Sequence, residues 1–256
     1  MAVDLSIREA SGKSQVTVDA STTTFLAGNL LAYNGSAWVK ADADSATVQI
    51  PRWVCLNSVE AGGSSTYTMP VARRVVMVDV DAPYTADGLL FLSATAGAVT
   101  HTNPTAAAGT VQRCVGWALS TSEVVIDLEI PHYFVTLNMA GTVPATASNY
   151  EHFYTATRPL RVIGAVESHR TAGSDGSAVT LDVFKSASGG ALNSGATVLA
   201  TTFNLKSTAD TPVAVGPSAT ASAARLATGD RLEASDAGTL TAVAGLTLTV
   251  VMIEEN

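Results

Sequence analysis

The sequence predicts an all-β protein, and three observations lead to that prediction. Charged residues make up only 14% of the 256 residues, and Ala, Thr, Val, Ser and Gly dominate the rest, a mixture that favours strands and tight turns. The apolar fraction of 47% is too high for a disordered chain. Strand-like runs recur roughly every 8–12 residues with turn signals between them. We therefore expect a small β-barrel-like domain followed by a C-terminal antiparallel β-sandwich of jelly-roll type.

Composition and spacing divide the chain into three parts. Residues 1–20 are polar and short of large apolar side chains, which predicts an N-terminal arm. A first β-domain follows over residues 21–130, and the β-sandwich domain spans residues 131–256. The boundary is placed near Ile130 because the spacing of apolar residues changes there and aromatic residues become frequent.

The predicted arm has an alternating pattern of its own. Val3, Leu5 and Ile7 alternate with polar residues, as do Val16 and Val18. Such alternation would let the arm add a strand to the sheet edge of a neighbouring molecule. An ordinary first strand or a frayed terminus is the alternative.

Turn signals place the strands of the first β-domain. Asn34-Gly35, between Tyr33 and Trp38, is the strongest short hairpin signal, because both positions of such a turn need positive φ. Pro51 interrupts the run 47–56, which suits an edge strand or a bulge. The other strand-like runs cover residues 65–69, 72–80, 89–92, 99–102, 111–119 and 124–128.

The second domain shows a comparable density of strands. Residues 179–185 (VTLDVFK) alternate cleanly, and residues 159–167 read as a strand with Arg161 pointing outward. Residues 149–154 fit either a strand or a short helical turn. Further strand-like runs cover residues 134–143, 197–205, 211–215 and 245–253. This density fits a jelly-roll sandwich best.

Charge, cysteine content and hydropathy restrict the function classes. The formal net charge is −8, and no basic stripe exists, so we expect no direct binding of nucleic acid. Cys55 and Cys114 both lie in strand-like runs and read as buried reduced thiols rather than as a disulfide. The N-terminus lacks the pattern of a signal peptide, and no apolar run is long enough to span a bilayer. We expect a soluble protein made in the cytoplasm, with no membrane partner.

Patterns that would indicate nucleophilic catalysis are missing. None of the four histidines lies near a G-x-S-x-G motif, and Cys114 sits inside an apolar strand, where a thiol is usually inert. The glycine-rich stretch 172–176 lacks the Lys-Ser/Thr pair of a phosphate-binding loop. We therefore expect no enzyme, no catalytic residue and no cofactor.

Paired carboxylates are weak candidates for glycoside hydrolysis or metal binding. A glycosidase needs two carboxylates in an aromatic-lined cleft, and nothing in the sequence gathers Trp38, Trp53 or Trp117 around a pair of acids. The start of a calcium loop is faintly present at 42–45, without the glycine and final Glu of that motif. Solvated turns and strand ends are the better interpretation, and no metal site is predicted. The pairs are Asp42/Asp44, Asp79/Asp81 and Glu254/Glu255.

One stretch carries a family resemblance. Residues 88–128 (GLLFLSATAGAVTHTNPTAAAGTVQRCVGWALSTSEVVIDL) read as strand, glycine turn, strand, loop, strand, turn and strand, and residues 27–33 (AGNLLAY) and 53–63 (WVCLNSVEAGG) continue the pattern. This order resembles the small β-domain of tailed-phage capsid decoration proteins, also called cement or head-stabilisation proteins. The resemblance covers residues 25–130.

The resemblance implies a structural virion protein. Such a protein would bind the outside of a phage capsid, bridge neighbouring copies of the major capsid protein and stabilise the shell, as a homotrimer on symmetric sites. The acidic surface suits a particle component that must not bind packaged DNA, although ordinary solubility explains it equally well. A tail-tube or neck protein of the same build would look similar. The candidate capsid contacts are Val3, Leu5, Ile7, Arg8, Lys13, Arg52, Arg73 and Arg74, for each of which a merely solvated or structural role is the alternative.

Two other functions remain open. A receptor- or glycan-binding module of a head fibre or tail fibre would use exposed aromatic residues, and Tyr150, His152 and Tyr154 form the one suitable cluster in the sequence. A capsule depolymerase would need a carboxylate pair, for which Asp79 and Asp81 are the candidates.

Overall fold

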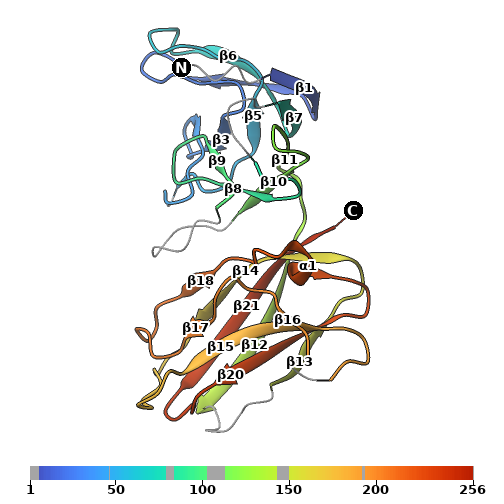
Figure 1. Ribbon diagram of the computed structural model, residues 1–256. Coiled ribbons are helices and arrows are strands. Elements are labelled where there is room, and N and C mark those ends of the chain that lie inside the picture. The colour runs from blue at the N-terminus through green and yellow to red at the C-terminus, as the bar shows by residue number, and fades with distance from the viewer. Residues whose placement is uncertain are drawn as a thin grey trace. The chain divides into compact units, whose positions relative to one another are not determined.

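The computed structural model describes residues 6–45, 47–78, 84–102, 113–142, 150–191 and 194–255. The chain forms two compact units, residues 1–130 and 131–256, which are described separately (Figure 1). The described residues form strands joined by turns and irregular segments, with one four-residue helix, α1 (Ala221–Ala224). The all-β prediction is confirmed.

The first unit contains a small closed barrel of five strands, as the sequence predicts. The strand order is β2-β4-β3-β5-β6. Apolar side chains fill the interior, among them Phe25, Leu31 and Met69, each at most 2% exposed. The strands are β2 (Ser14–Val18), β3 (Leu30–Tyr33), β4 (Trp38–Lys40), β5 (Trp53–Cys55) and β6 (Tyr67–Ala72).

A six-stranded sheet completes this unit. Its order is β1-β7-β11-β10-β8-β9, and every neighbouring pair is antiparallel. Its inner face shares a second core with the barrel, because Leu30 and Val54 of the barrel pack with Val75, Leu90 and Ile126 of the sheet. The strands are β1 (Ser6–Ser11), β7 (Arg74–Val78), β8 (Leu89–Leu92), β9 (Val99–Thr100), β10 (Cys114–Ala118) and β11 (Glu123–Asp127).

The predicted N-terminal arm is corrected over residues 6–18. Strand β1 pairs with β7 along the sheet, and β2 pairs with β6 inside the barrel. Ile7 packs against the core shared by barrel and sheet, and Val16 and Val18 are buried. The apolar alternation that suggested addition to a neighbour is used within the unit itself. Val3 and Leu5 lie outside the described residues.

The predicted hairpin at Asn34-Gly35 joins β3 to β4, with a different turn. The loop has four residues, and of the pair only Gly35 has positive φ, at 100°. The Asn34 side-chain oxygen Oδ1 accepts hydrogen bonds from the backbone N–H groups of Ser36 (3.0 Å) and Ala37 (2.9 Å). The asparagine therefore stabilises the turn through its side chain rather than through a left-handed backbone.

Replacing this asparagine is the first test of the turn. Asn34→Ala removes these two hydrogen bonds and a third that the Ser36 hydroxyl donates to the same oxygen (3.0 Å), so we expect the free energy of unfolding to fall by about 1 kcal/mol. Urea denaturation measures the change, and Ser36→Ala, which keeps both backbone bonds, serves as the control. Equal stability of the Asn34→Ala variant and the parent would show that the turn does not need this side chain.

The second unit is an antiparallel β-sandwich. One sheet has the order β12-β21-β14-β18 with β19 beside β14, and the other has the order β13-β20-β15-β16 with β17 beside β15. A single core lies between them, because Val162 and Leu248 of the first sheet pack with Leu181 and Leu232 of the second. The first sheet comprises β12 (His132–Thr142), β14 (Leu160–Ser168), β18 (Val213–Val215), β19 (Arg225–Leu226) and β21 (Ala244–Glu254). The second comprises β13 (Tyr150–Thr155), β15 (Thr180–Ser186), β16 (Ala196–Thr197), β17 (Phe203–Asn204) and β20 (Arg231–Ala237).

Three local predictions for secondary structure and exposure are wrong. The run 197–205 forms two short strands, because the chain turns between Leu199 and Phe203 and buries both side chains in the core. Only residues 53–55 of the run 47–56 form a strand. Arg161, predicted to point outward, is 8% exposed. Helix α1 has no counterpart among the predicted elements.

Candidate functional site

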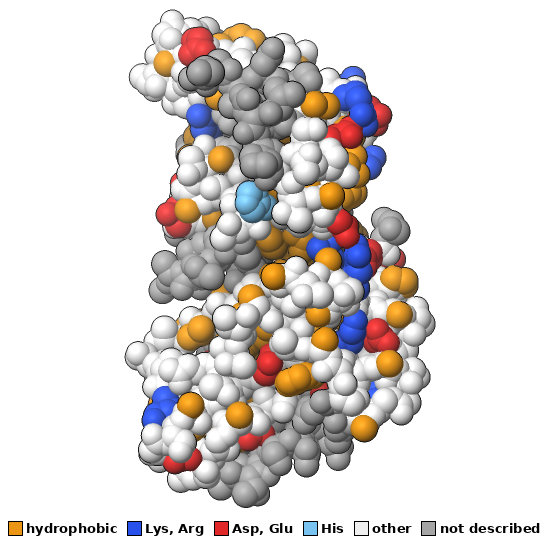
Figure 2. Space-filling model, in the orientation of Figure 1, with side chains coloured by type: hydrophobic (Ala, Val, Ile, Leu, Met, Phe, Trp, Pro, Cys, Tyr) orange, Lys and Arg blue, Asp and Glu red, His pale blue; other side chains and the backbone are white. Residues whose placement is uncertain are grey.

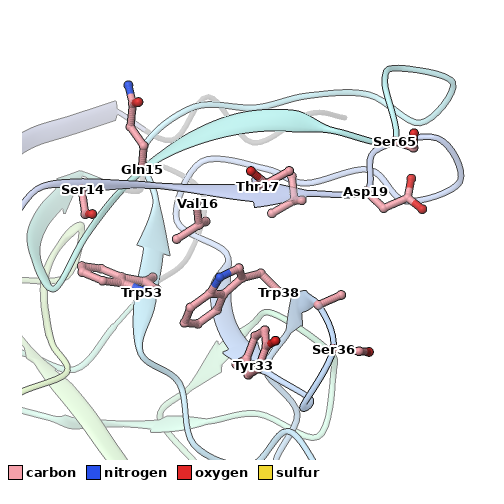
Figure 3. A pocket seen from close by; sticks show the side chains of 12 residues that line it. Ser14, Gln15, Val16, Thr17, Asp19, Tyr33, Ser36, Trp38, Trp53 and Ser65 are labelled. Atoms are coloured by element: carbon pink, nitrogen blue, oxygen red, sulfur yellow. The ribbon is translucent and has the colours of Figure 1, made fainter.

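An open groove of about 620 Å³ lies beside strand β2 in the first unit (Figure 3). Strand β2 forms one wall, and three aromatic side chains lie opposite, below Val16 in the view. The lining residues are Ser14, Gln15, Val16, Thr17, Val18, Asp19, Tyr33, Ser36, Ala37, Trp38, Trp53 and Ser65.

The backbone of β2 presents hydrogen-bonding groups to this groove. Gln15 pairs with Pro70 of β6, and the carbonyl of Pro70 accepts a hydrogen bond from Leu56 on the opposite side of β6. Since Pro70 directs its carbonyl away from β2 and has no N–H, the Gln15 pair is of the non-hydrogen-bonded type. The N–H and C=O of Gln15 therefore point away from β6, on the edge of β2 that β4 approaches at Val18. Within the described residues, β4 reaches β2 only through the pairing of Val18 with Trp38.

The aromatic side of the groove is held in place by ring contacts. Tyr33 and Trp38 have ring centroids 5.3 Å apart at an interplanar angle of 55°. The guanidinium of Arg73 lies 5.0 Å from the centroid of the Trp53 ring, so a cation–π contact covers one face of that indole. Tyr33 is 47% exposed, and both tryptophans are partly exposed. The groove therefore offers accessible ring faces in fixed positions.

The charge of the groove comes from one carboxylate. Asp19 Oδ1 accepts hydrogen bonds from the hydroxyl (2.5 Å) and the backbone N–H (2.9 Å) of Ser21, and these bonds lower the pKa of Asp19. No Lys or Arg occurs among the described residues that line the groove. The site therefore suits an uncharged or cationic ligand better than a phosphate or another anion.

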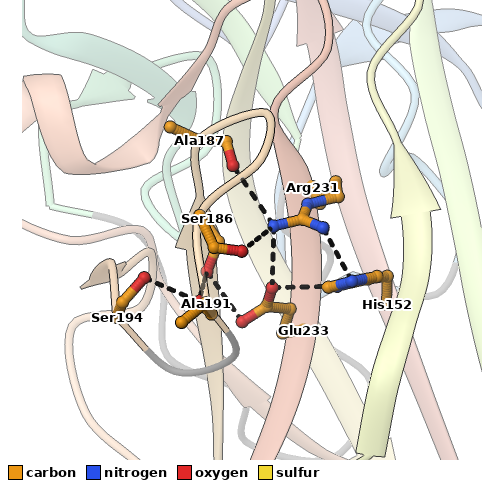
Figure 4. Close-up of polar contacts among 8 residues, drawn as sticks. His152, Ser186, Ala187, Ala191, Ser194, Arg231 and Glu233 are labelled. Carbon is orange, nitrogen blue, oxygen red and sulfur yellow. Dashed lines mark hydrogen bonds and ion pairs between the residues drawn. The ribbon is translucent and has the colours of Figure 1, made fainter.

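The second unit contains a polar network on the outer face of β13, β15 and β20 (Figure 4). Glu233 is fully buried; it accepts a hydrogen bond from Ser186 (2.7 Å) and lies 2.9 Å from Nδ1 of His152. Arg231 Nη1 lies 2.8 Å from Nε2 of the same histidine, and its Nη2 donates to the carbonyl of Gly190 (2.5 Å). The network joins three strands to the loop that follows β15.

The donor and acceptor roles in this network exclude a nucleophilic triad at these residues. The guanidinium of Arg231 can only donate, so Nε2 of His152 accepts its hydrogen bond, while Nδ1 lies 2.9 Å from Oε1 of Glu233. A triad needs the free nitrogen of the histidine beside a serine hydroxyl. Here that nitrogen faces Arg231, and Ser186 donates to the carboxylate instead. The arrangement serves to hold the loop on the sheet.

A second buried pair lies on β14 and the residue after it. Glu167 and His169 have side chains that are 0% exposed, with Oε1 and Nδ1 2.8 Å apart. His169 Nε2 lies 3.1 Å from the carbonyl oxygen of Ser207 and therefore donates to it. Burial raises the pKa of Glu167, and the hydrogen bond from His169 partly opposes that rise.

The predicted capsid contacts do not form one free basic patch. Arg8 forms an ion pair with Glu123, Arg73 with Glu129 at 2.6 Å, and Arg74 with Asp127 at 3.5 Å. These carboxylates belong to the same unit, so much of the positive charge is neutralised locally. Lys13 and Arg52 are exposed.

The predicted aromatic cluster on β13 is divided between the two faces of its sheet. His152 lies opposite Glu233 on the outer face, whereas Tyr154 lies opposite Leu232 and packs against the core. Register shifts on both sides of His152 cause this division. The side chain of Tyr150 lies outside the described residues.

Where the structure describes them, the carboxylates of the predicted pairs interact with neighbouring residues of their own unit. Burial and the neighbouring Asp44 raise the pKa of Asp42. Glu254 accepts a hydrogen bond from Tyr133 (2.9 Å), and Glu255 forms an ion pair with Arg225 (2.5 Å). Asp79 and Asp81 lie outside the described residues. Across the described ranges, no three His, Cys, Asp or Glu side chains come together as metal ligands.

Both cysteines are buried, and neither is in a disulfide. Burial raises the pKa of Cys55 to about 12, so its thiol stays protonated at neutral pH. Cys114 lies in the central region of the six-stranded sheet, with its Sγ 3.4 Å from the carbonyl oxygen of Gly116. Neither thiol has the character of a reactive nucleophile.

Comparisons of this chain with protein-family models, curated proteins and solved structures found no match. No helix among the described residues is long and apolar enough to cross a membrane.

The groove could not be predicted from the sequence, because Trp38 and Trp53 are brought beside β2 only when the barrel closes. The one sequence signal for this site is an aromatic residue close to an Asn-Gly turn, which is the position of Trp38.

Proposed function

We propose that this protein is a non-enzymatic component of a tailed-phage particle that binds the outer surface of the capsid and bridges capsid subunits as a homotrimer. The family resemblance of residues 25–130 supports the proposal, and so does their folding into a small barrel with an attached sheet. The major capsid protein and further copies of this chain would be its partners, and the capsid surface of the virion would be its location.

The single observation that carries the proposal is the edge strand β1. It pairs with β7 on one side, and no other described strand pairs with it. An open strand edge is a ready site for a partner's strand, and charged side chains on it prevent uncontrolled association. Arg8 and Glu9 provide these charges, with side chains that are 53% and 66% exposed. A capsid subunit that supplied a matching strand would cover this edge.

The order of strands in the second unit supports a finer assignment, a jelly roll. Taking β12, β13, β14, β15, β16, β18, β20 and β21 as strands one to eight gives the sheet orders 1-8-3-6 and 2-7-4-5. Two interlocked Greek keys produce this order, and folds of this type serve as viral capsid and lectin domains. A unit of this kind on a particle surface would project outward or complete the contact between trimer subunits.

The first experiment is the solution mass by light scattering. A trimer has a mass of about 79 kDa, three times 26.2 kDa, and symmetric capsid sites favour that state. A monomer at every accessible concentration would contradict the trimeric form of the proposal. Co-sedimentation with expanded phage heads then tests capsid binding directly, and a protein that stays in the supernatant would contradict it.

A charge reversal tests the role of the β1 edge. We expect Arg8→Glu to weaken head binding about tenfold, because a positive charge at the proposed contact is matched by an acidic capsid surface, which would repel the reversed charge. Arg170→Glu on the second unit makes the same change of charge on an exposed residue outside that edge and is the matched control. Equal binding of the two variants would move the contact away from β1.

A further inference from the structure

The groove beside β2 combines features that match a particular class of ligand. Ring faces from Tyr33, Trp38 and Trp53 lie on one side, and backbone N–H and C=O groups of β2 lie on the other. We propose that this groove binds an uncharged oligosaccharide. The inference depends on the groove alone and holds independently of any attachment to a capsid.

The aromatic side chains favour the flat apolar faces of sugar rings. The C–H bonds on one face of a pyranose are attracted to the negative face of a π-system. Arg73 contacts one face of Trp53, Tyr33 contacts Trp38, and both tryptophans pack against the barrel core, so these rings are positioned before a ligand binds. Preorganised rings keep the entropic cost of binding low.

The polar side of the groove favours hydroxyl groups. Gln15, which lines the hollow, has both a donor and an acceptor on the edge of β2 that faces away from β6, and Ser14 lines the same wall. No side-chain hydrogen bond of Ser14 occurs within the described part of the chain. A sugar hydroxyl both donates and accepts, so it satisfies mixed backbone groups that a purely anionic or cationic ligand cannot. The volume of about 620 Å³ lies within the usual range for small-ligand sites.

An extended peptide fits this groove less well. A peptide strand that adds to an edge needs a continuous row of backbone groups. The open edge of β2 offers only Gln15 and Thr17 before Val18 pairs with Trp38. The three rings add contact area of a kind that suits sugars.

The test begins with the full chain on an array of bacterial surface oligosaccharides that includes uncharged and acidic members. We expect binding to at least one uncharged member, with a change of tryptophan fluorescence on titration in solution. Tyr33→Ala should weaken that binding about tenfold, since one stacked ring is removed. Phe134→Ala, which removes an aromatic ring that is 68% exposed on the second unit, is the matched control and should leave binding unchanged.

Trp38→Ala gives a second measurement on the same site, with thermal unfolding of each variant recorded to separate loss of binding from loss of fold. Absence of binding to every uncharged member would overturn the proposal. Equal binding by Tyr33→Ala and Phe134→Ala would also overturn it. So would an extended peptide that displaces the sugar and binds the same residues more tightly.

Discussion

Replacement of Gly116 by alanine is expected to destabilise the first unit by about 3 kcal/mol, because the added methyl group has no room. Gly116 lies in β10, between β11 and β8, where it pairs with Ile126 and Leu90. A Cβ atom at this position would lie 1.9 Å from the backbone oxygen of Val125 and 2.9 Å from its carbonyl carbon. The obstructing atoms belong to the backbone of the neighbouring strand, so relief requires the two strands to separate.

The measurement is chemical denaturation followed by tryptophan fluorescence, for which the adjacent Trp117 is a local probe. Gly63→Ala is the matched control in the same unit, since its added Cβ would meet Ala20, Glu60 and Val59 only at 3.5 Å or more. We expect that control to change stability by less than about 0.5 kcal/mol. Equal denaturation midpoints for the two variants would contradict the close approach of β10 and β11.

Much of this fold can be predicted from the local sequence pattern. Strands β15 and β21 are readable because their residues alternate between core and surface, and β14 because residues 162–166 (VIGAV) are an apolar run. The Asn34-Gly35 hairpin is readable because both of its strands and its turn are adjacent in sequence. These features depend only on neighbours along the chain, so one sequence contains all of the information.

Features that depend on contacts between segments far apart in the sequence could not be predicted. The arm became β1 and β2 because residues 67–78, some 60 residues away, supply their partner strands. Two register shifts in β13 turned His152 away from Tyr154, and alternation alone gives no sign of such shifts. The groove needed β2, β3, β4 and β5 to be placed together, so its aromatic residues looked unrelated in the sequence.

Loss of the His169 side chain is expected to cost the second unit about 3–5 kcal/mol at neutral pH, the range for breaking a buried pair by removing one partner. In His169→Ala, the carboxylate of Glu167 would keep its 0% exposure and lose the Nδ1 partner at 2.8 Å. A buried carboxylate without that partner is strongly disfavoured in its charged form. The pKa of Glu167, already raised by burial, should therefore rise further in this variant.

The sign of the pH dependence follows from that rise. A carboxyl whose folded-state pKa lies above the unfolded value of about 4.5 stabilises the fold when it is protonated, and that stabilisation is lost as the pH rises through the folded-state pKa. His169→Ala should therefore lose more stability between about pH 5 and about pH 8 than the parent does.

The double variant Glu167→Gln/His169→Ala carries no ionisable group at either position and should lack the additional slope. Denaturant titrations at both pH values decide the matter, because equal slopes for the single and double variants would show that Glu167 does not titrate in this range. Recovery of stability in the double variant at the higher pH would identify the uncompensated charge, rather than the lost volume of the imidazole, as the cause of the destabilisation.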